Sequence, residues 1–181
     1  IARRVVGAKI FSPAGHCLTL SEKMAGDEVG IVLDRVFFDK YLARLAIDEG
    51  ADVKLKTAAT GLIMENGKIA GVKATSPEGD LTIKAKCVVG ADGYESQVGR
   101  WAGIDTKLSP KDITSCFQYR LTGLDYDPDY CEFYLGSKAP GGYIWIFPKD
   151  EETANVGMGI QLAQLKTPAQ IKQTLDRFIE N

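Results

Sequence analysis

The chain has little of the chemistry that metal sites and disulfide frameworks require. It contains one histidine, His16, and four cysteines, no two of which stand in a CxxC pair. Structural zinc sites use closely spaced cysteine and histidine ligands, so no metal site is expected here. The wide spacing of the cysteines favours buried, reduced thiols in a reducing compartment; they are Cys17, Cys87, Cys116 and Cys131.

Basic runs and long apolar runs are also missing. The net charge is -2 at pH 7, and no cluster of lysine and arginine could follow a phosphate backbone, so nucleic acid is not an expected partner. No run of about 18 apolar residues could span a bilayer, and no signal-peptide pattern is visible. The chain begins at Ile1 rather than at a methionine and ends within a helical pattern, so we expect it to be a piece of a longer polypeptide.

The residues that are present predict a mixed fold in which short strands dominate. Of the 181 residues, 45% are hydrophobic and 25% are charged, enough to bury one good core or parts of two smaller ones. Alternating and β-branched runs predict strands at 5–11, 17–20, 29–33, 51–56, 60–65, 68–75, 81–85, 87–89, 113–121, 131–135, 143–147 and 155–161. Helices are predicted at 34–50, at 96–103 and from Thr167 onward.

Two of these strands, 51–56 and 87–89, are candidates for a parallel sheet. The strands between them, with Asn66-Gly67 at one turn, predict an antiparallel β-meander inserted into that sheet. The fold class predicted is therefore α/β with mixed α+β character.

The helix at 34–50 shows the clearest periodicity. Its apolar residues recur at helical spacing and predict one apolar face: Phe38, Tyr41, Leu42, Leu45 and Ala46. Asp34 suits the N-cap, and Gly50 suits the left-handed position that follows a helix. Arg35 lies at the junction between strand and helix, where a guanidinium could bind a phosphate or a carboxylate. From position alone, a surface ion pair is the favoured alternative for Arg35.

The segment from Cys87 to Arg100 has the sequence CVVGADGYESQVGR. It predicts a strand, a glycine-bearing turn and a helix, the layout that presents free backbone N–H groups to an anionic ligand. A tight turn can require glycine for backbone reasons only, so both interpretations stay open for this segment.

An aromatic stripe follows at 139–149, with the sequence APGGYIWIFPK. Strand alternation places Tyr143, Trp145 and Phe147 on one face and Ile144 with Ile146 on the other. The three rings could wall a cavity for a long apolar or planar ligand, although such a stripe is more often the core face of a sheet.

Taken together, three segments resemble the geranylgeranyl reductases, a family within the p-hydroxybenzoate-hydroxylase-like superfamily of FAD proteins. The segments are VLDRVFFDKYLARLAIDEGADV, VVGADGYESQVGRWAG and PGGYIWIFPKDEETANVGMG. The first two are widespread among these flavoproteins, and the third is more specific to the reductases. The resemblance implies part of a Rossmann-like FAD/NAD(P)-binding domain with a β-meander insertion, together with an antiparallel-sheet substrate domain.

By that resemblance, residues 1–33 and 106–181 belong to the substrate domain, which binds isoprenoid. Residues 34–105 belong to the FAD-binding domain, with the meander at 59–85 inserted. Arg35 would contact the FAD pyrophosphate, and Ala59 would offer backbone contacts near the adenine. Asp92 and Gly93 would shape the loop on the cofactor side, with Asp92 ordering that loop rather than doing chemistry.

The substrate side is assigned in the same way. Tyr143, Trp145 and Phe147 would line the isoprenoid cavity, and Gly141 and Gly142 would keep its entrance open. The family's GxGxxG, PCG and GDA segments have no counterpart in these 181 residues. The resemblance therefore implies a native protein about twice this length, as expected of a two-domain flavoenzyme, and a chain that does not hold FAD tightly by itself.

The implied activity is reduction of C=C bonds in geranylgeranyl chains of archaeal membrane lipids or their precursors, with hydride from reduced FAD. A reduced electron donor, ferredoxin or nicotinamide, and a peripheral contact with the membrane from the cytoplasm are implied as well. No residue of the chain is a convincing proton donor. Three alternatives remain: an aromatic-hydroxylase-type monooxygenase, a non-catalytic isoprenoid-binding module, and a relative of electron-transfer flavoproteins, which should carry an iron–sulfur cysteine set.

Overall fold

The computed structural model describes residues 2–21 and 30–180, and Val29 of the predicted strand 29–33 lies outside these residues. The chain divides into two compact units, one formed by residues 1–42 and 108–181 and the other by residues 43–107. Both units mix strands and helices, so the mixed fold class predicted from the sequence is confirmed.

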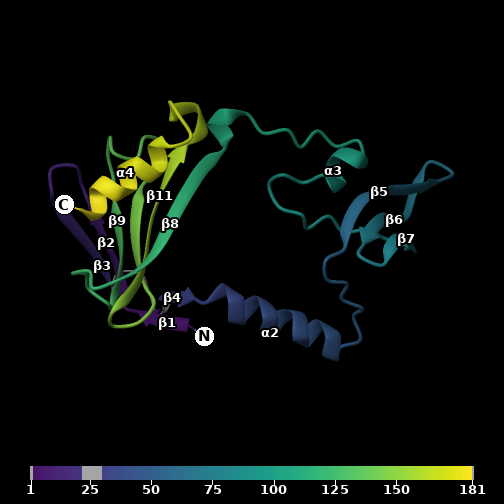
Figure 1. The fold of residues 1–181 in the computed structure, drawn as a ribbon, viewed down its shortest axis with the longest axis horizontal. Helices are drawn as coiled ribbons and strands as arrows, with labels where there is room; N and C mark the ends of the chain where they lie inside the picture. Colours follow the sequence, from purple (N-terminus) through teal and green to yellow (C-terminus); the bar gives the residue numbers. More distant parts are fainter. Residues whose placement is uncertain (1, 22–29, 181) are drawn as a thin grey trace. The chain divides into compact units, whose positions relative to one another are not determined.

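The first unit is built on a six-stranded sheet with the order β3-β2-β9-β10-β11-β8. Its strands are β2 (Gly7–Phe11), β3 (Cys17–Ser21), β8 (Thr114–Thr122), β9 (Tyr130–Tyr134), β10 (Ile144–Pro148) and β11 (Thr153–Gln161). The pair β2–β9 is parallel and the other pairs are antiparallel. Helix α4 (Gln170–Ile179) lies along one face of this sheet (Figure 1).

The core of the first unit lies between α4 and the sheet. Ile171 and Leu175 of α4 are buried there against alternate residues of β10 and β11. The buried members from the sheet are Ile144, Ile146, Ala154, Val156, Met158 and Ile160. Because strand residues alternate between faces, the odd-numbered residues of β10 must face away from α4.

A two-stranded ribbon joins this sheet to the long helix. Strand β1 (Ala2–Val5) pairs with β4 (Gly30–Leu33), and helix α2 (Arg35–Asp48) begins two residues after β4 ends. Asp34 caps α2 through its Oδ1, which accepts a hydrogen bond from the Val36 amide at 3.2 Å. Gly50 has a φ of +92°, the left-handed conformation expected of it.

The second unit contains the predicted meander. Strands β5 (Ala58–Glu65), β6 (Lys68–Ser76) and β7 (Gly79–Lys84) form a three-stranded antiparallel sheet. Asn66 and Gly67 have φ values of 51° and 74°, as the tight hairpin turn requires. Short elements complete the chain: α3 (Val98–Trp101) in this unit, and the 3-10 turns η1 (Pro110–Asp112) and η2 (Leu162–Gln164) in the first.

Several expectations were wrong. Residues 51–56 and 87–89 do not form strands, and the helix predicted at 96–103 is reduced to α3. A parallel strand is held by hydrogen bonds to neighbouring strands, and among the described residues no strand pairs with either segment.

Burial differs from expectation too. Helix α2 buries none of its residues within the described part of the chain, and exposed apolar side chains such as Val36, Phe37 and Ile47 lie outside the face that was predicted for it. The expectation of buried thiols also fails, since Cys17, Cys87 and Cys116 are exposed and Cys131 is half-buried.

Candidate functional site

An aromatic ladder crosses the face of the six-stranded sheet that is turned away from α4. Its members are Phe133 of β9 together with Tyr143, Trp145 and Phe147. The ring centroids of Tyr143 and Trp145 are 5.8 Å apart, and those of Trp145 and Phe147 are 5.9 Å apart. Phe133 meets both Tyr143 and Phe147 at 5.5 Å. These four rings form one continuous apolar surface, which we call the aromatic ladder.

The two faces of β10 have different surroundings. Ile144 and Ile146 are 1% and 7% exposed and belong to the core, whereas Tyr143 is 42% exposed and Trp145 and Phe147 are half-buried. The predicted division of the strand into two faces is therefore confirmed. The alternative in which the aromatic stripe is the core face of the sheet is wrong, because the isoleucine face packs against α4.

Trp145 is fixed in place by its neighbours. Its indole Nε1–H donates a hydrogen bond of 3.1 Å to the Oε1 of Gln118 on β8. Gly157 lies between these two residues on β11 and is the register partner of both. A Cβ at Gly157 would collide with the Trp145 ring, 2.6 Å from its Cε2. Glycine at this position therefore allows the indole to lie flat across the sheet.

Aliphatic side chains extend the ladder face toward β2 and β3. Ile10 is the register partner of Phe133 and of Leu18, so the three side chains share a face. Leu18 is 56% exposed. The result is a broad apolar surface in which aromatic rings predominate, as expected where a long apolar ligand lies against a sheet.

Gly141 and Gly142 stand at one end of the ladder, before Tyr143. A Cβ at Gly142 would overlap the Gly159 carbonyl of β11, and one at Gly141, where φ is +70°, would lie 2.7 Å from the Gln161 Cβ. Both glycines thus let the loop pass close to β11. This packing requirement accounts for them without an entrance, and their predicted role at a cavity entrance stays a prediction.

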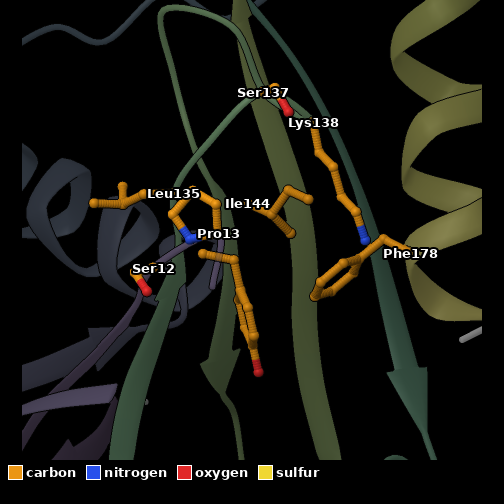
Figure 2. Close-up of a pocket in the computed structure, with 8 residues that line it drawn as sticks. Ser12, Pro13, Leu135, Ser137, Lys138, Ile144 and Phe178 are labelled. Atoms are coloured by element: carbon orange, nitrogen blue, oxygen red, sulfur yellow. The ribbon is translucent and has the colours of Figure 1, made fainter. Parts of the chain in front are cut away.

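The opposite face of the sheet borders cavities beside α4, two of which lie next to Phe178. One, shown in Figure 2, has a volume of about 170 Å³ and is lined by residues that include Ile144, Lys138 and Phe178. The Nζ of Lys138 lies 5.9 Å from the centre of the Phe178 ring. The other, of about 430 Å³, is bordered by Tyr134, Ile146 and Phe178. These cavities adjoin the core rather than the aromatic ladder.

A buried carboxylate lies near these cavities. Glu132 is 5% exposed, and its Oε2 accepts a hydrogen bond of 2.6 Å from the Tyr134 hydroxyl. Burial, reinforced by this bond, raises the pKa of Tyr134 above its ordinary value. Tyr134 therefore stays protonated as a hydrogen-bond donor to Glu132. Nearby, Lys9 and Asp127 form an ion pair at 2.7 Å.

Arg35 is the first residue of α2 and belongs to the first unit. Its Nε and Nη2 donate to the two carboxylate oxygens of Asp39 at 2.8 and 3.0 Å, and this pairing holds the pKa of Asp39 below its usual range. The surface ion pair considered for Arg35 therefore exists. The side chain remains 74% exposed, and its Nη1 has no hydrogen-bond partner among residues 2–21 and 30–180.

Asp92 organises the loop of the GADG segment in the second unit. Its carboxylate accepts hydrogen bonds from the Ser96 hydroxyl at 2.8 Å and from the amides of Gln97 and Val98 at 2.7 and 3.1 Å. These bonds lower the pKa of Asp92 to about 2. Gly93 has a φ of +75°, which favours glycine. The loop-ordering role expected for Asp92 has a clear physical basis in these contacts.

Ala59 lies on β5, opposite Ala74 of β6. The pairing register shifts between Ala59 and Gly61, so the strand is irregular immediately beside Ala59. β5 is an edge strand of its sheet, so one side of its backbone is free of sheet hydrogen bonds within the described part of the chain.

The structure thus brings the predicted substrate residues together on β10 and in the loop that directly precedes it. It places Arg35 in the same compact unit. Ala59, Asp92 and Gly93 belong to the second unit. Phe133, a member of the ladder, and Gln118, the hydrogen-bond partner of Trp145, were not predicted as site residues. Both lie in predicted strands, but the register that sets them beside Trp145 comes from long-range pairing that periodicity does not show.

The geometry agrees with what the chain resembles among known proteins. Residues 112–181, which include the aromatic stripe, match the family described as the geranylgeranyl reductase catalytic domain. A digeranylgeranylglycerophospholipid reductase from Methanocella arvoryzae is 54% identical over 88% of this chain and 41% of the relative. One from Thermoplasma volcanium is 50% identical over 100% of this chain and 46% of the relative.

Solved structures agree at the level of the fold and of the family. The crystal structure of a geranylgeranyl bacteriochlorophyll reductase-like protein from Thermoplasma acidophilum superimposes with a TM-score of 0.93 at 49% identity, covering 99% of this chain and 46% of that one. The myxobacterial FAD-dependent halogenase for chondrochloren superimposes with a TM-score of 0.73 at 15% identity, covering 98% of this chain and 42% of that one. The latter likeness shows the fold alone.

The fold is therefore that of the flavin-dependent reductases and halogenases. Within that class, the chain is similar over its whole length to digeranylgeranylglycerophospholipid reductases, and residues 112–181 match the geranylgeranyl reductase catalytic domain. It spans less than half the length of the curated relatives that it matches, 41% and 46% in the two cases above. Among the described residues, no helix is long and apolar enough to cross a membrane, and no group of His, Cys, Asp and Glu side chains is arranged to hold a metal ion.

Proposed function

We propose that the protein to which this chain belongs reduces C=C bonds in the geranylgeranyl chains of membrane lipids or their precursors, with FAD as its cofactor. The observation that carries this proposal is the aromatic ladder, a partly exposed apolar wall on the sheet face away from the core. It lies within the segment that matches the reductase catalytic domain. An isoprenoid chain is long, apolar and partly planar, and a flat wall of aromatic rings suits it.

The proposal divides the chain into two domains, and the beginning of α2, which the compact units group with the large sheet, is assigned to the cofactor side. The strands of residues 1–33 and the sheet of residues 106–181 form the substrate domain, with Tyr143, Trp145 and Phe147 lining the isoprenoid site. Residues 34–105 form part of the FAD-binding domain, in which Ala59, Asp92 and Gly93 shape the cofactor side. Arg35, at the beginning of α2, binds the pyrophosphate of FAD.

The chemistry of Arg35 fits a pyrophosphate. Its guanidinium is largely exposed, and Asp39 uses only the Nε and Nη2 side of the fork. The remaining N–H groups can donate charge-assisted hydrogen bonds to phosphate oxygens. Asp39 would then act as the second partner that fixes the guanidinium plane, which reduces the entropy lost when a phosphate binds.

When bound and reduced, FAD supplies a hydride for the alkene. An isolated C=C bond has no polar group by which the protein could activate it, so alignment supplies much of the catalysis. The ladder contributes by holding the chain flat against Trp145 and Phe147. Its apolar surface also keeps water away from the reacting carbons. No ladder residue is assigned as the proton donor.

A substrate embedded in lipid also suggests where the protein works. With an isoprenoid lipid as substrate and no spanning helix among the described residues, we propose peripheral contact with the membrane from the cytoplasm. The electron donor in this proposal is a reduced ferredoxin or a nicotinamide.

The proposal is tested with the full-length protein under anaerobic conditions. The protein is purified with its flavin, reduced chemically, and mixed with a geranylgeranyl glycerophospholipid in detergent. Reoxidation of the flavin together with a lipid product that has gained hydrogen at its double bonds is the expected result. A full-length protein that purifies without flavin and cannot be loaded with it would instead indicate a binding module. Oxygen-dependent hydroxylation with no alkene reduction would indicate a monooxygenase.

A further inference from the structure

Lys149 joins the ladder strand to the junction that carries Arg35. Its Nζ donates a hydrogen bond of 3.0 Å to the backbone carbonyl of Leu33, 116 residues away in the sequence. Leu33 is the last residue of β4, and only Asp34 separates it from Arg35. Lys149 follows β10 directly, two residues beyond Phe147 of the ladder. A single side chain therefore spans the two places to which substrate and cofactor contacts are assigned above.

The Leu33 carbonyl has no role inside α2. The first helical hydrogen bond runs from the Phe38 amide to the Asp34 carbonyl at 3.0 Å, so Leu33 lies just outside the helix. Each residue has only two soft backbone dihedral angles. Because Asp34 alone separates Leu33 from Arg35, fixing the Leu33 carbonyl restricts the backbone position of Arg35. The hydrogen bond from the Val36 amide to the Asp34 side chain further restricts the backbone at the start of α2.

The Lys149 end of the bond is also rigid. The Lys149 amide donates to the Thr153 carbonyl at 2.8 Å, which closes the connection between β10 and β11. Within that connection, the Asp150 Oδ1 accepts hydrogen bonds from the amides of Glu152 and Thr153 at 3.0 and 2.7 Å. The Lys149 side chain therefore extends from a well-defined loop toward the helix junction.

The ribbon itself is held by a separate set of contacts. Arg3 of β1 forms ion pairs with Glu151 at 2.6 Å and Asp129 at 3.3 Å, and the Val6 amide donates to the Asp129 carbonyl at 2.7 Å. Loss of the Lys149 ammonium would leave these contacts in place. Its effect should therefore concentrate at the Leu33–Arg35 junction, without detaching the ribbon.

We propose that Lys149 is a positioning residue, which sets the start of α2, and with it the Arg35 guanidinium, relative to the ladder strand. The inference rests on the proposed function, because it assumes that Arg35 binds the cofactor. Lys149 touches neither substrate nor cofactor in this account; it acts through the Leu33 carbonyl.

The test measures FAD affinity rather than turnover, by titrating full-length apoprotein with FAD and following flavin fluorescence. Lys149→Met should raise the FAD dissociation constant about tenfold, the order of a lost charge-assisted hydrogen bond. Lys149→Arg, which keeps a cationic donor, should restore most of the affinity. Lys172→Met on α4, which removes an ammonium far along the sequence, serves as the control and should leave the dissociation constant within about twofold of the parent value.

A double-mutant cycle with Arg35→Met separates positioning from a direct contact. If Lys149 acts through Arg35, then Lys149→Met should add no further loss of affinity once Arg35 is absent. An equal loss in both backgrounds would overturn the proposal. Weakened binding in Arg35→Met with unchanged binding in Lys149→Met would overturn the positioning role and leave the cofactor role of Arg35 standing. Unchanged binding in Arg35→Met would refute that cofactor role, and the positioning role with it.

Amide exchange supplies a readout that does not involve flavin. The amides of Val36 and Phe38 should exchange faster in Lys149→Met and return toward the parent rate in Lys149→Arg. Lys149→Gln, a milder change that keeps an uncharged donor, is measured alongside and should give an intermediate rate, so the test survives poor folding of the methionine variant. Parent-like exchange at both amides in the glutamine and methionine variants would contradict the proposal.

Discussion

Gly157 shows how a single missing side chain shapes the proposed site. The Trp145 ring occupies the space above it, with its Cε2 2.6 Å from where a Cβ would be. Gly157→Ala should therefore displace the indole and cost about 1–3 kcal/mol of stability, as overpacking typically does. Denaturant unfolding of the full-length protein measures the cost, and tryptophan fluorescence reports the displacement.

A smaller ring should relieve the strain. In a Trp145→Phe background, the same Gly157→Ala substitution should cost clearly less, because the second ring of the indole is gone. An equal loss of stability in the two backgrounds would show that the Trp145 ring is not the reason why glycine is needed at position 157.

Asp92 gives a prediction about pH. Its three hydrogen bonds lower its pKa from an ordinary value of 3.8 to about 2. A carboxyl whose pKa is lower in the folded state contributes stability that is complete above its unfolded pKa and is lost as the pH falls through the folded one. The contribution of Asp92 should therefore be intact at neutral pH and disappear between about pH 4 and about pH 2.

The carboxyl titration can be followed directly by NMR in the full-length protein. A native-state signal of Asp92 that stays ionised well below pH 3.8 agrees with the loop geometry. The amides of Gln97 and Val98 should lose protection in Asp92→Asn at neutral pH. Half-protonation of Asp92 already near its ordinary pKa would show that the loop is not closed by these bonds.

Among single residues, the sequence predicted those whose role is local. The Asp34 cap, the left-handed Gly50 and the Asn66-Gly67 turn follow from backbone chemistry within a few residues, and the structure confirms them. Phe133 and Lys149 could not be found in this way. Their partners lie far away in the sequence, and only the strand register and the loop geometry bring them together.

At the scale of elements, α4 is the support of the six-stranded sheet. Leu175 is 0% exposed at the centre of its contact with the sheet. Leu175→Ala should cost about 3 kcal/mol, because it removes buried apolar area and leaves a cavity. Gln173→Ala, at an exposed position of the same helix, is the matched control and should change stability by no more than about 0.5 kcal/mol. Similar costs for the two variants would mean that α4 is not part of the core.

Strands that pair with other strands of the described chain were predicted well from their alternating sequence pattern. Segments that would need a further strand to pair with were not. The meander and the alternating strands of the large sheet appear as expected, since each pairs within the chain. Segments 51–56 and 87–89 were predicted as parallel strands, yet no strand in the described part of the chain pairs with them. Helix α2 was predicted as a helix, but its apolar residues do not gather on one face, and none of them is buried among the described residues.

At the scale of the whole molecule, the six-stranded sheet offers an apolar ligand two different faces. One carries the aromatic ladder, and the other carries α4 with its cavities of about 170 and 430 Å³. We assign the isoprenoid chain to the ladder face. That assignment rests on the partial exposure of the rings, on the glycine beneath Trp145 and on the family match of the segment.

Photolabelling distinguishes the two faces in one measurement. A geranylgeranyl lipid bearing a diazirine in its chain is bound to the full-length protein, irradiated, and located by peptide mass spectrometry. Labelling of Phe133, Tyr143, Trp145 or Phe147, competed away by unlabelled lipid, is the result that the account predicts. Competable labelling confined to the cavity side, at Lys138 or Phe178, would contradict it.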